Sequence, residues 1–144
     1  MNFLLKKENQ LIKKFVVLES LEEKYLFLIK IGKLLPLLNK KYLIEKYLIN
    51  NCQSKIWFKL NHKNNKLIIK AYTEALIPRG LLFLITRIFS NSETKDVLNY
   101  NYYPFIQKIG LNFVLSPLRS NGLLIILNKI KFYVLKNLSL KAYT

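Results

Sequence analysis

Cys52 is the side chain of this sequence best suited to covalent chemistry, and it is the only cysteine among 144 residues. One thiol cannot form an internal disulfide, nor by itself supply a cysteine-based zinc or iron–sulfur site. It follows Asn51, and asparagine tolerates positive φ better than other non-glycine residues, which favours a turn. Lys55 lies close in sequence, and a cation favours the nucleophilic thiolate. The residues predict an accessible, reactive thiol; the alternative is a structural adaptor in which Cys52 is buried and inert.

His62 is the only histidine and therefore the obvious candidate for a Cys–His pair. If residues 54–60 form a strand, His62 lies at the opposite end of it from Cys52, roughly 23 Å away at ~3.3 Å per residue. A dyad like that of a cysteine protease is therefore not expected, and we interpret His62 as a turn residue. A thiolate without a paired base suits sulfur exchange at a persulfide, in which the thiolate attacks a sulfur atom.

A small antiparallel sheet is expected around Cys52. The segments 54–60 and 66–72 are rich in β-branched and aromatic residues, and the polar cluster 61–65 between them predicts a hairpin. Residues 48–50 are a third strand candidate that runs into Cys52. The sheet should therefore have about three strands, with Cys52 on a turn between two of them.

Helices are expected before and after this sheet along the chain. Ser20 and Glu23 form a capping-box pattern, and Pro36 ends the helix that follows. Helices before a sheet and helices after it indicate an α+β fold. The remaining expected helices span 9–18, 74–89 with Thr73 as cap, 92–99 with Ser92 as cap, 104–110 with Pro104 as the start and Gly110 as the stop, and a last helix capped by Ser120. This last helix should have an apolar face formed by Leu123, Ile126, Leu127, Ile130 and Val134.

The net charge of +16 raises the possibility of a basic nucleic-acid-binding domain. The lysines are, however, spread along the whole chain, and the strands show no stacking signature. We interpret the charge mainly as composition and a solvated basic surface, so that nucleic acid is not the expected partner. The nucleic-acid-binding domain stays as the alternative, which a salt-sensitive gel shift would favour.

The sequence predicts one cytoplasmic domain that does not contact a membrane. No stretch reaches the ~18 uninterrupted apolar residues of a spanning helix. The best candidate, residues 76–89, is broken by Pro78, Arg79 and Arg87. The first residues have no secretion-type apolar stretch or cleavage site. A single domain is expected over residues 1–144, with its core at about 9–137.

Three motifs occur in order along the chain. Residues 51–57 read Asn-Cys-Gln-Ser-Lys-Ile-Trp, residues 79–81 read Arg-Gly-Leu, and residues 115–123 read Leu-Ser-Pro-Leu-Arg-Ser-Asn-Gly-Leu. They resemble the Gly-Cys-Gln-Ser-x-Val-Trp, Lys/Arg-Gly-Leu and Leu-Ser-Pro-x-Arg-x-x-Gly-Leu motifs of the SufE family of cysteine desulfuration proteins. The resemblance extends over residues 20–136. Asn51 stands where the family usually has glycine.

The resemblance implies a role in sulfur transfer. A SufS-type, pyridoxal-phosphate-dependent cysteine desulfurase would form a persulfide, and Cys52 would accept its outer sulfur. The protein would stimulate the desulfurase and deliver sulfur to an iron–sulfur scaffold similar to the SufBCD complex. It would be a carrier and activator and not an enzyme, with no cofactor or metal of its own. By the same resemblance, Asn51, Gln53, Ser54 and Arg119 would shape the pocket or the docking surface of Cys52.

Overall fold

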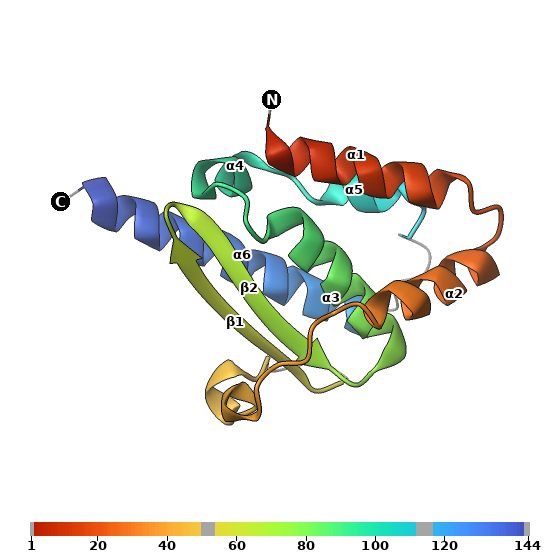
Figure 1. The fold of residues 1–144 in the computed structure, drawn as a ribbon, viewed down its shortest axis with the longest axis horizontal. Coiled ribbons are helices and arrows are strands. Elements are labelled where there is room, and N and C mark those ends of the chain that lie inside the picture. The colour runs from red at the N-terminus through yellow and green to blue at the C-terminus, as the bar shows by residue number, and fades with distance from the viewer. Residues whose placement is uncertain (1, 50–53, 112–116, 143–144) are drawn as a thin grey trace.

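The chain folds as an α+β domain, as the sequence predicts (Figure 1). The computed structural model describes residues 2–49, 54–111 and 117–142. These residues form six α-helices and one two-stranded antiparallel sheet. In chain order the elements are α1 (Phe3–Val16), α2 (Leu21–Gly32), the short 3-10 turns η1 (Lys40–Tyr42) and η2 (Glu45–Tyr47), β1 (Ile56–Lys63), β2 (Lys66–Thr73), α3 (Leu76–Phe89), α4 (Thr94–Asn99), α5 (Tyr103–Lys108) and α6 (Pro117–Ala142).

The hairpin of β1 and β2 is longer than the sequence predicts. Its turn is only Asn64 and Asn65, with φ of 55° and 62°. Two central residues with positive φ match the right-handed twist of the flanking strands, which is why asparagine suits this turn. Pairing therefore continues to Lys63 opposite Lys66. The prediction of a turn over residues 61–65 was too wide, and His62 is a strand residue.

The expected third strand is reduced to a single bridge. Leu48 pairs with Trp57 in an isolated antiparallel bridge. The Ile49 amide donates to the carbonyl of Ile56 at 2.8 Å. Among the described residues, the sheet itself contains only β1 and β2.

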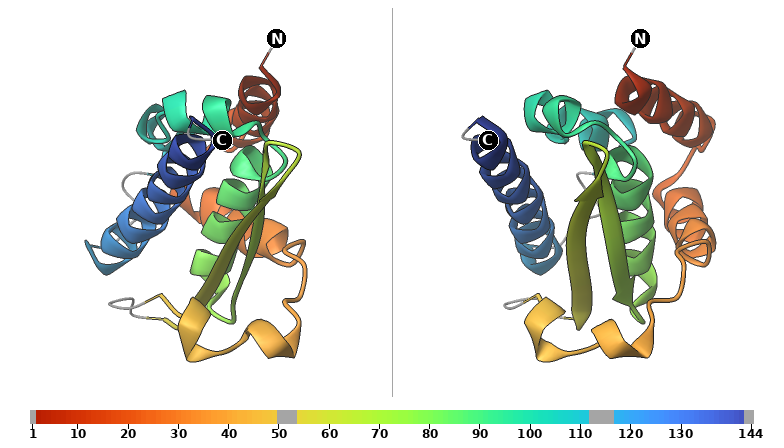
Figure 2. Two further views of the ribbon diagram at one scale, coloured as in Figure 1. Left: turned by 90° about the vertical axis from the view of Figure 1, so that its left-hand side faces the viewer. Right: turned by 60° about the vertical axis from the view of Figure 1, so that its left-hand side comes forward.

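Two helices cover the sheet, α3 along β2 and α6 along β1, and α2 packs against the other side of α3 (Figure 2). The apolar face predicted for the last helix is confirmed, because it is buried in the core. Its buried members are Leu123, Ile126, Leu127, Ile130 and Val134.

The close packing of α2 on α3 depends on two glycines. A Cβ at Gly80 would lie 2.4 Å from the carbonyl oxygen of Leu28, and a Cβ at Gly32 would lie 2.9 Å from the Gly80 nitrogen. Both values are shorter than any contact a real Cβ makes, and the neighbouring atoms are backbone. The Arg-Gly-Leu motif therefore contributes to packing through its glycine.

The first helix begins earlier than the predicted start at residue 9. The side chain of Asn2 accepts a hydrogen bond from the Leu4 amide at 2.8 Å and caps α1. Leu4 is buried, and the carboxylate of Glu8 accepts a hydrogen bond from the Tyr100 hydroxyl. These contacts are long-range, so the local pattern of residues 1–8 did not reveal them.

Three residues that the sequence predicts as helix caps have a different place or different hydrogen bonds in the structure. Ser20 accepts from the Glu23 amide as expected, but Glu23 accepts from Glu19 and does not close the capping box. Ser92 donates to the carbonyl of Ile88 at 2.7 Å, and α4 begins after it at Thr94. Ser120 lies inside α6, which begins at Pro117, because proline is favourable in the first turn of a helix.

No helix in the described ranges is long and apolar enough to span a membrane.

Candidate functional site

The predicted reactive segment is only partly within the described residues. Asn51, Cys52 and Gln53 lie outside them, whereas Ser54 is described and half-buried. The structure describes the residues on either side of this segment, up to Ile49 and from Ser54 onward.

Two backbone contacts hold the ends of this segment together. Ile49 donates to the carbonyl of Ile56, and Leu48 bridges to Trp57. The side chains of Ile49 and Ile56 are only 4% and 7% exposed, so both ends are anchored in the core. The residues that flank the segment with Cys52 therefore lie at the end of β1 remote from the hairpin turn.

Thr73 anchors the chain directly after this segment. Its side chain is fully buried, and its hydroxyl donates to the carbonyl of Lys55 at 2.8 Å. The same hydroxyl accepts from the Ala75 amide at 3.3 Å. The sequence predicted Thr73 as a helix cap, whereas α3 has Ala75 as its N-cap residue without a side-chain cap. Only the strand register, which places Thr73 opposite Ile56, reveals its role next to the segment.

Two aromatic rings lie on the outer face of the sheet at the same end, and a cation lies beside one of them. The rings of Trp57 and Tyr72, opposite each other in the register, have centroids 6.4 Å apart. The Arg79 guanidinium of α3 lies 5.5 Å from the Tyr72 ring centre. Its Nε is buried and has no hydrogen-bond partner among the described residues. Arg79 belongs to the Arg-Gly-Leu motif, and its place beside Tyr72 follows only from the fold.

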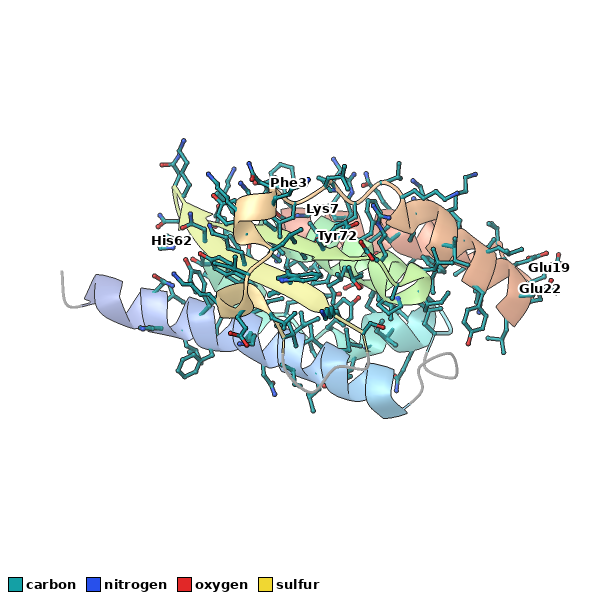
Figure 3. The ribbon with its side chains drawn as sticks, turned by 90° about the horizontal axis from the view of Figure 1, so that it is seen from below. Phe3, Lys7, Glu19, Glu22, His62 and Tyr72 are labelled. Atoms are coloured by element: carbon teal, nitrogen blue, oxygen red, sulfur yellow. The ribbon has the colours of Figure 1, made fainter. Side chains whose placement is uncertain are left out.

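His62 lies at the other end of β1 (Figure 3). Six residues separate it from Ile56, which corresponds to roughly 20 Å of strand. Its Nδ1 is 2.7 Å from the hydroxyl of Tyr133 in α6. Burial raises the pKa of Tyr133. His62 thus joins the hairpin to α6. Cys52 lies outside the described residues, so the expectation that no Cys–His pair forms stays a prediction.

Arg119 lies in the first turn of α6, but its side chain is outside the described part of the structure. Residues 115 and 116 of the same motif are outside it as well. The nearness of Arg119 to Cys52 therefore stays a prediction. Among the described residues, no three His, Cys, Asp or Glu side chains gather as metal ligands would.

These features define an α+β domain with its single thiol on a segment held at one end of a β-hairpin. The chain belongs to the SufE family: the model of that family, an Fe-S metabolism associated domain, matches residues 9–134. This confirms the family that the three motifs predicted, and it gives the protein a role in iron–sulfur metabolism.

A solved structure supports the fold. The solution structure of a hypothetical protein from Thermus thermophilus superimposes with a TM-score of 0.75 at 20% sequence identity. The match covers 92% of this chain and 96% of the other. At this identity the likeness concerns the fold alone.

Proposed function

We propose that this protein accepts sulfur on Cys52 from a SufS-type cysteine desulfurase and delivers it to an iron–sulfur scaffold similar to SufBCD. The observation that supports this most directly is that the only thiol of a SufE-family chain lies in a segment whose two ends are fastened. Anchored ends restrict where a short segment can place a side chain, and a protein that docks into a partner's active site requires such restriction.

The proposed reaction is one thiol exchange. The Cys52 thiolate attacks the outer sulfur of the desulfurase persulfide, the sulfur–sulfur bond of that persulfide breaks, and the desulfurase cysteine leaves as a thiolate. Cys52 then holds the persulfide, and transfer to an acceptor returns it to the thiolate. No oxidant, reductant or metal is consumed. The pyridoxal phosphate belongs to the desulfurase, and this chain acts as a cytoplasmic carrier and activator without a cofactor.

The chemistry needs a thiolate, which a cation close to Cys52 would favour. Lys55 follows the segment, and Arg79 lies near Tyr72. Positive charge near a thiol lowers its pKa and increases the nucleophilic fraction. A base such as histidine is not required, which agrees with the position of His62 at the far end of β1.

We assign docking roles to the remaining motif residues. Asn51 can adopt the left-handed turn that the family glycine would adopt, although at a cost. Gln53, Ser54 and Arg119 would contact the desulfurase or shape the pocket of Cys52.

Steady-state turnover of a cysteine desulfurase tests this proposal. Wild-type protein should raise the rate of alanine formation from cysteine, because it removes the persulfide that blocks the next cycle. Cys52→Ser should fold and give no stimulation. Equal stimulation by both proteins would contradict the proposal.

A further inference from the structure

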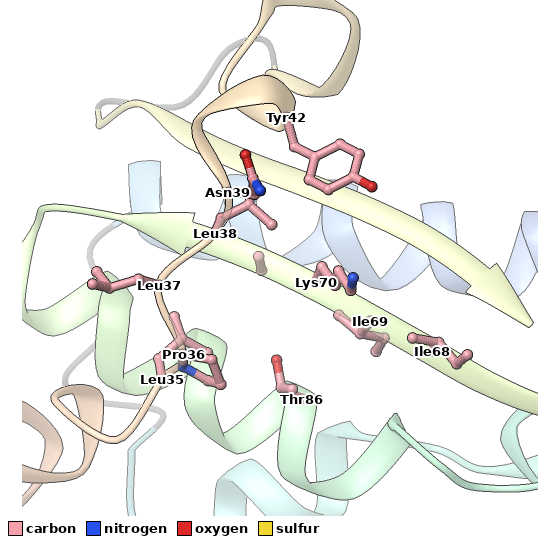
Figure 4. A pocket seen from close by; sticks show the side chains of 11 residues that line it. Leu35, Pro36, Leu37, Leu38, Asn39, Tyr42, Ile68, Ile69, Lys70 and Thr86 are labelled. Carbon is pink, nitrogen blue, oxygen red and sulfur yellow. The ribbon is translucent and has the colours of Figure 1, made fainter.

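A pocket of about 330 Å³ lies on the opposite edge of the hairpin from η2 (Figure 4). It is bounded by the segment 35–39, by the edge of β2 and by Thr86 of α3. Its walls are mostly apolar, with Leu35, Ile69 and Ala71 among them. The Thr86 hydroxyl points toward β2 and has no hydrogen-bond partner among the described residues. We call this pocket the strand-edge groove.

Along this groove, β2 carries backbone groups that face away from β1. Leu67 directs its backbone away from β1, since its amide donates to Ser92 and its carbonyl accepts from Asn91. Every second residue of a strand points the same way, so Ile69 and Ala71 also direct their backbone groups outward. The Ile69 amide donates a hydrogen bond to the Ser90 hydroxyl at 3.3 Å.

Beyond that contact, two backbone groups of this edge are unpaired. In the described ranges, the Ile69 carbonyl and the Ala71 amide have no hydrogen-bond partner. Both residues line the groove. Ile69 and Ala71 are only 6% and 4% exposed, so these two groups lie at the floor of the groove. An unpaired donor and an unpaired acceptor on a strand edge are a template for an added strand.

Positive charge concentrates at the rim of the groove. The ammonium nitrogens of Lys41, Lys59 and Lys70 lie 5.0, 4.9 and 5.6 Å from the ring centre of Tyr42. Lys59 and Lys70 face each other in the register, an arrangement that destabilises a sheet. None of the three forms an ion pair with a carboxylate of the described residues. Hydrogen bonding to Lys41 and the positive charges around the ring lower the pKa of Tyr42. An acidic side chain would relieve this repulsion.

The groove fits a peptide better than a nucleic acid. Base stacking requires open aromatic faces. Here cations already lie over the rings: three lysines over Tyr42, Lys46 at 5.4 Å over Tyr47, and Arg79 over Tyr72. A strand edge beside an apolar groove instead offers main-chain hydrogen bonds and room for alternate side chains.

We propose that the strand-edge groove binds an extended acidic segment of a partner protein, which pairs with the edge of β2 at Ile69 and Ala71. Apolar side chains of the segment enter the groove, and its carboxylates contact Lys59 and Lys70. This proposal rests on the groove alone and does not depend on sulfur transfer at Cys52.

Fluorescence anisotropy at physiological ionic strength tests the proposal with two labelled peptides. One peptide alternates valine with glutamate, and the other replaces each glutamate by lysine. The acidic peptide should bind and the basic one should not. The double variant Lys59→Gln/Lys70→Gln should weaken binding of the acidic peptide by about tenfold, the size expected for two exposed ion pairs.

The matched control is Lys63→Gln/Lys66→Gln, a pair that also faces across the hairpin but lies nearer the turn and does not line the groove. It removes the same charge, and binding should change less than about twofold, well below the tenfold loss expected of two broken ion pairs. Equal weakening by both double variants would reduce the effect to overall charge and overturn the proposal.

A second probe tests the strand pairing without altering the protein. Methylation of alternate backbone nitrogens in the acidic peptide removes the amides that would pair with β2, and binding should be lost. Undiminished binding of the methylated peptide would overturn strand addition. Tighter binding of oligo(dT) than of the acidic peptide would overturn the choice of partner.

Discussion

At the scale of single residues, Thr73 is the clearest link between the fold and the reactive segment. Its buried hydroxyl joins the end of β2 to the carbonyl of Lys55, close to the point where residues 50–53 return to the fold. One hydrogen bond of this kind orders the chain next to a functional segment without touching the chemistry. Its loss should therefore affect both stability and sulfur transfer.

Thr73→Val keeps the shape of the side chain and removes the hydroxyl. The Lys55 carbonyl and the Ala75 amide then lose a partner, and we expect the free energy of unfolding to fall by about 1–3 kcal/mol. Urea denaturation measures this loss. The rate of sulfur loading on Cys52 should also fall, whereas Thr73→Ser should retain both properties. Unchanged loading in Thr73→Val would show that the segment does not depend on this anchor.

Tyr102 provides a second prediction at this scale. Its side chain is only 2% exposed, its hydroxyl has no hydrogen-bond partner among the described residues, and burial raises its pKa. A raised pKa means that the folded protein keeps a proton which the unfolded chain releases above about pH 10. The stabilisation is complete below that pH and is lost as the pH rises further, by about 1.4 kcal/mol per pH unit for one proton.

Tyr102→Phe should therefore make the loss of stability above pH 10 shallower by one proton. At neutral pH the variant should be as stable as the wild type or more stable, because an unpaired buried hydroxyl is removed. Denaturation midpoints across the alkaline range measure both effects. Tyr103→Phe is the control, since that side chain is half exposed. An identical alkaline slope in Tyr102→Phe would exclude the buried phenol as the cause.

At the scale of elements, the contact of α2 with α3 sets the position of the whole hairpin, because β2 packs on α3. Gly80 permits this contact, and a methyl group there would meet the backbone of Leu28 at 2.4 Å. Backbone cannot move aside as a flexible side chain can. The two helices must therefore separate if Gly80 is replaced.

Gly80→Ala should destabilise the protein by about 1–3 kcal/mol or more, which is the usual cost of overpacking. Thermal unfolding followed by circular dichroism measures the shift in Tm. Arg87→Ala, on the exposed side of the same helix, should leave Tm almost unchanged. A Tm for Gly80→Ala equal to that of the wild type would mean that α2 and α3 are less tightly packed than the structure indicates.

The sequence predicted elements well where the signal is local. The apolar period of the last helix, the proline and glycine that bound α5, and the two-strand hairpin depend on neighbours in the sequence. It failed where the partner is remote. Glu8 is buried only because Tyr100 reaches it, and Thr73 is placed beside the reactive segment only by the strand register.

The candidate site was predictable in part for the same reason. Cys52 follows from residue type and motif, and its separation from His62 stays a prediction, because Cys52 lies outside the described residues. Asparagines at 64 and 65 both adopt positive φ and make the turn tight, which residue type alone did not distinguish from a five-residue turn. The strand-edge groove is formed by three segments far apart in sequence, so no local pattern could have indicated it.

At the scale of the whole molecule, the net charge of +16 should act mainly on association rates. Attraction between a basic protein and an acidic partner accelerates their encounter, and salt screens it over ~8–10 Å. Raising the salt from low to physiological concentration should therefore slow association with the desulfurase by about tenfold, as stopped-flow fluorescence would measure. The dissociation rate should change less. An association rate independent of salt would mean that the charge takes no part in partner encounter.

The central claim is that Cys52 accepts a sulfur atom, and intact-mass spectrometry after incubation with a cysteine desulfurase and cysteine tests it directly. We predict that the wild-type chain gains the mass of one sulfur atom, that a thiol reductant removes it, and that Cys52→Ser gains nothing. Loading that persists in Cys52→Ser, or its absence from a folded wild-type protein that binds the desulfurase, would contradict the claim.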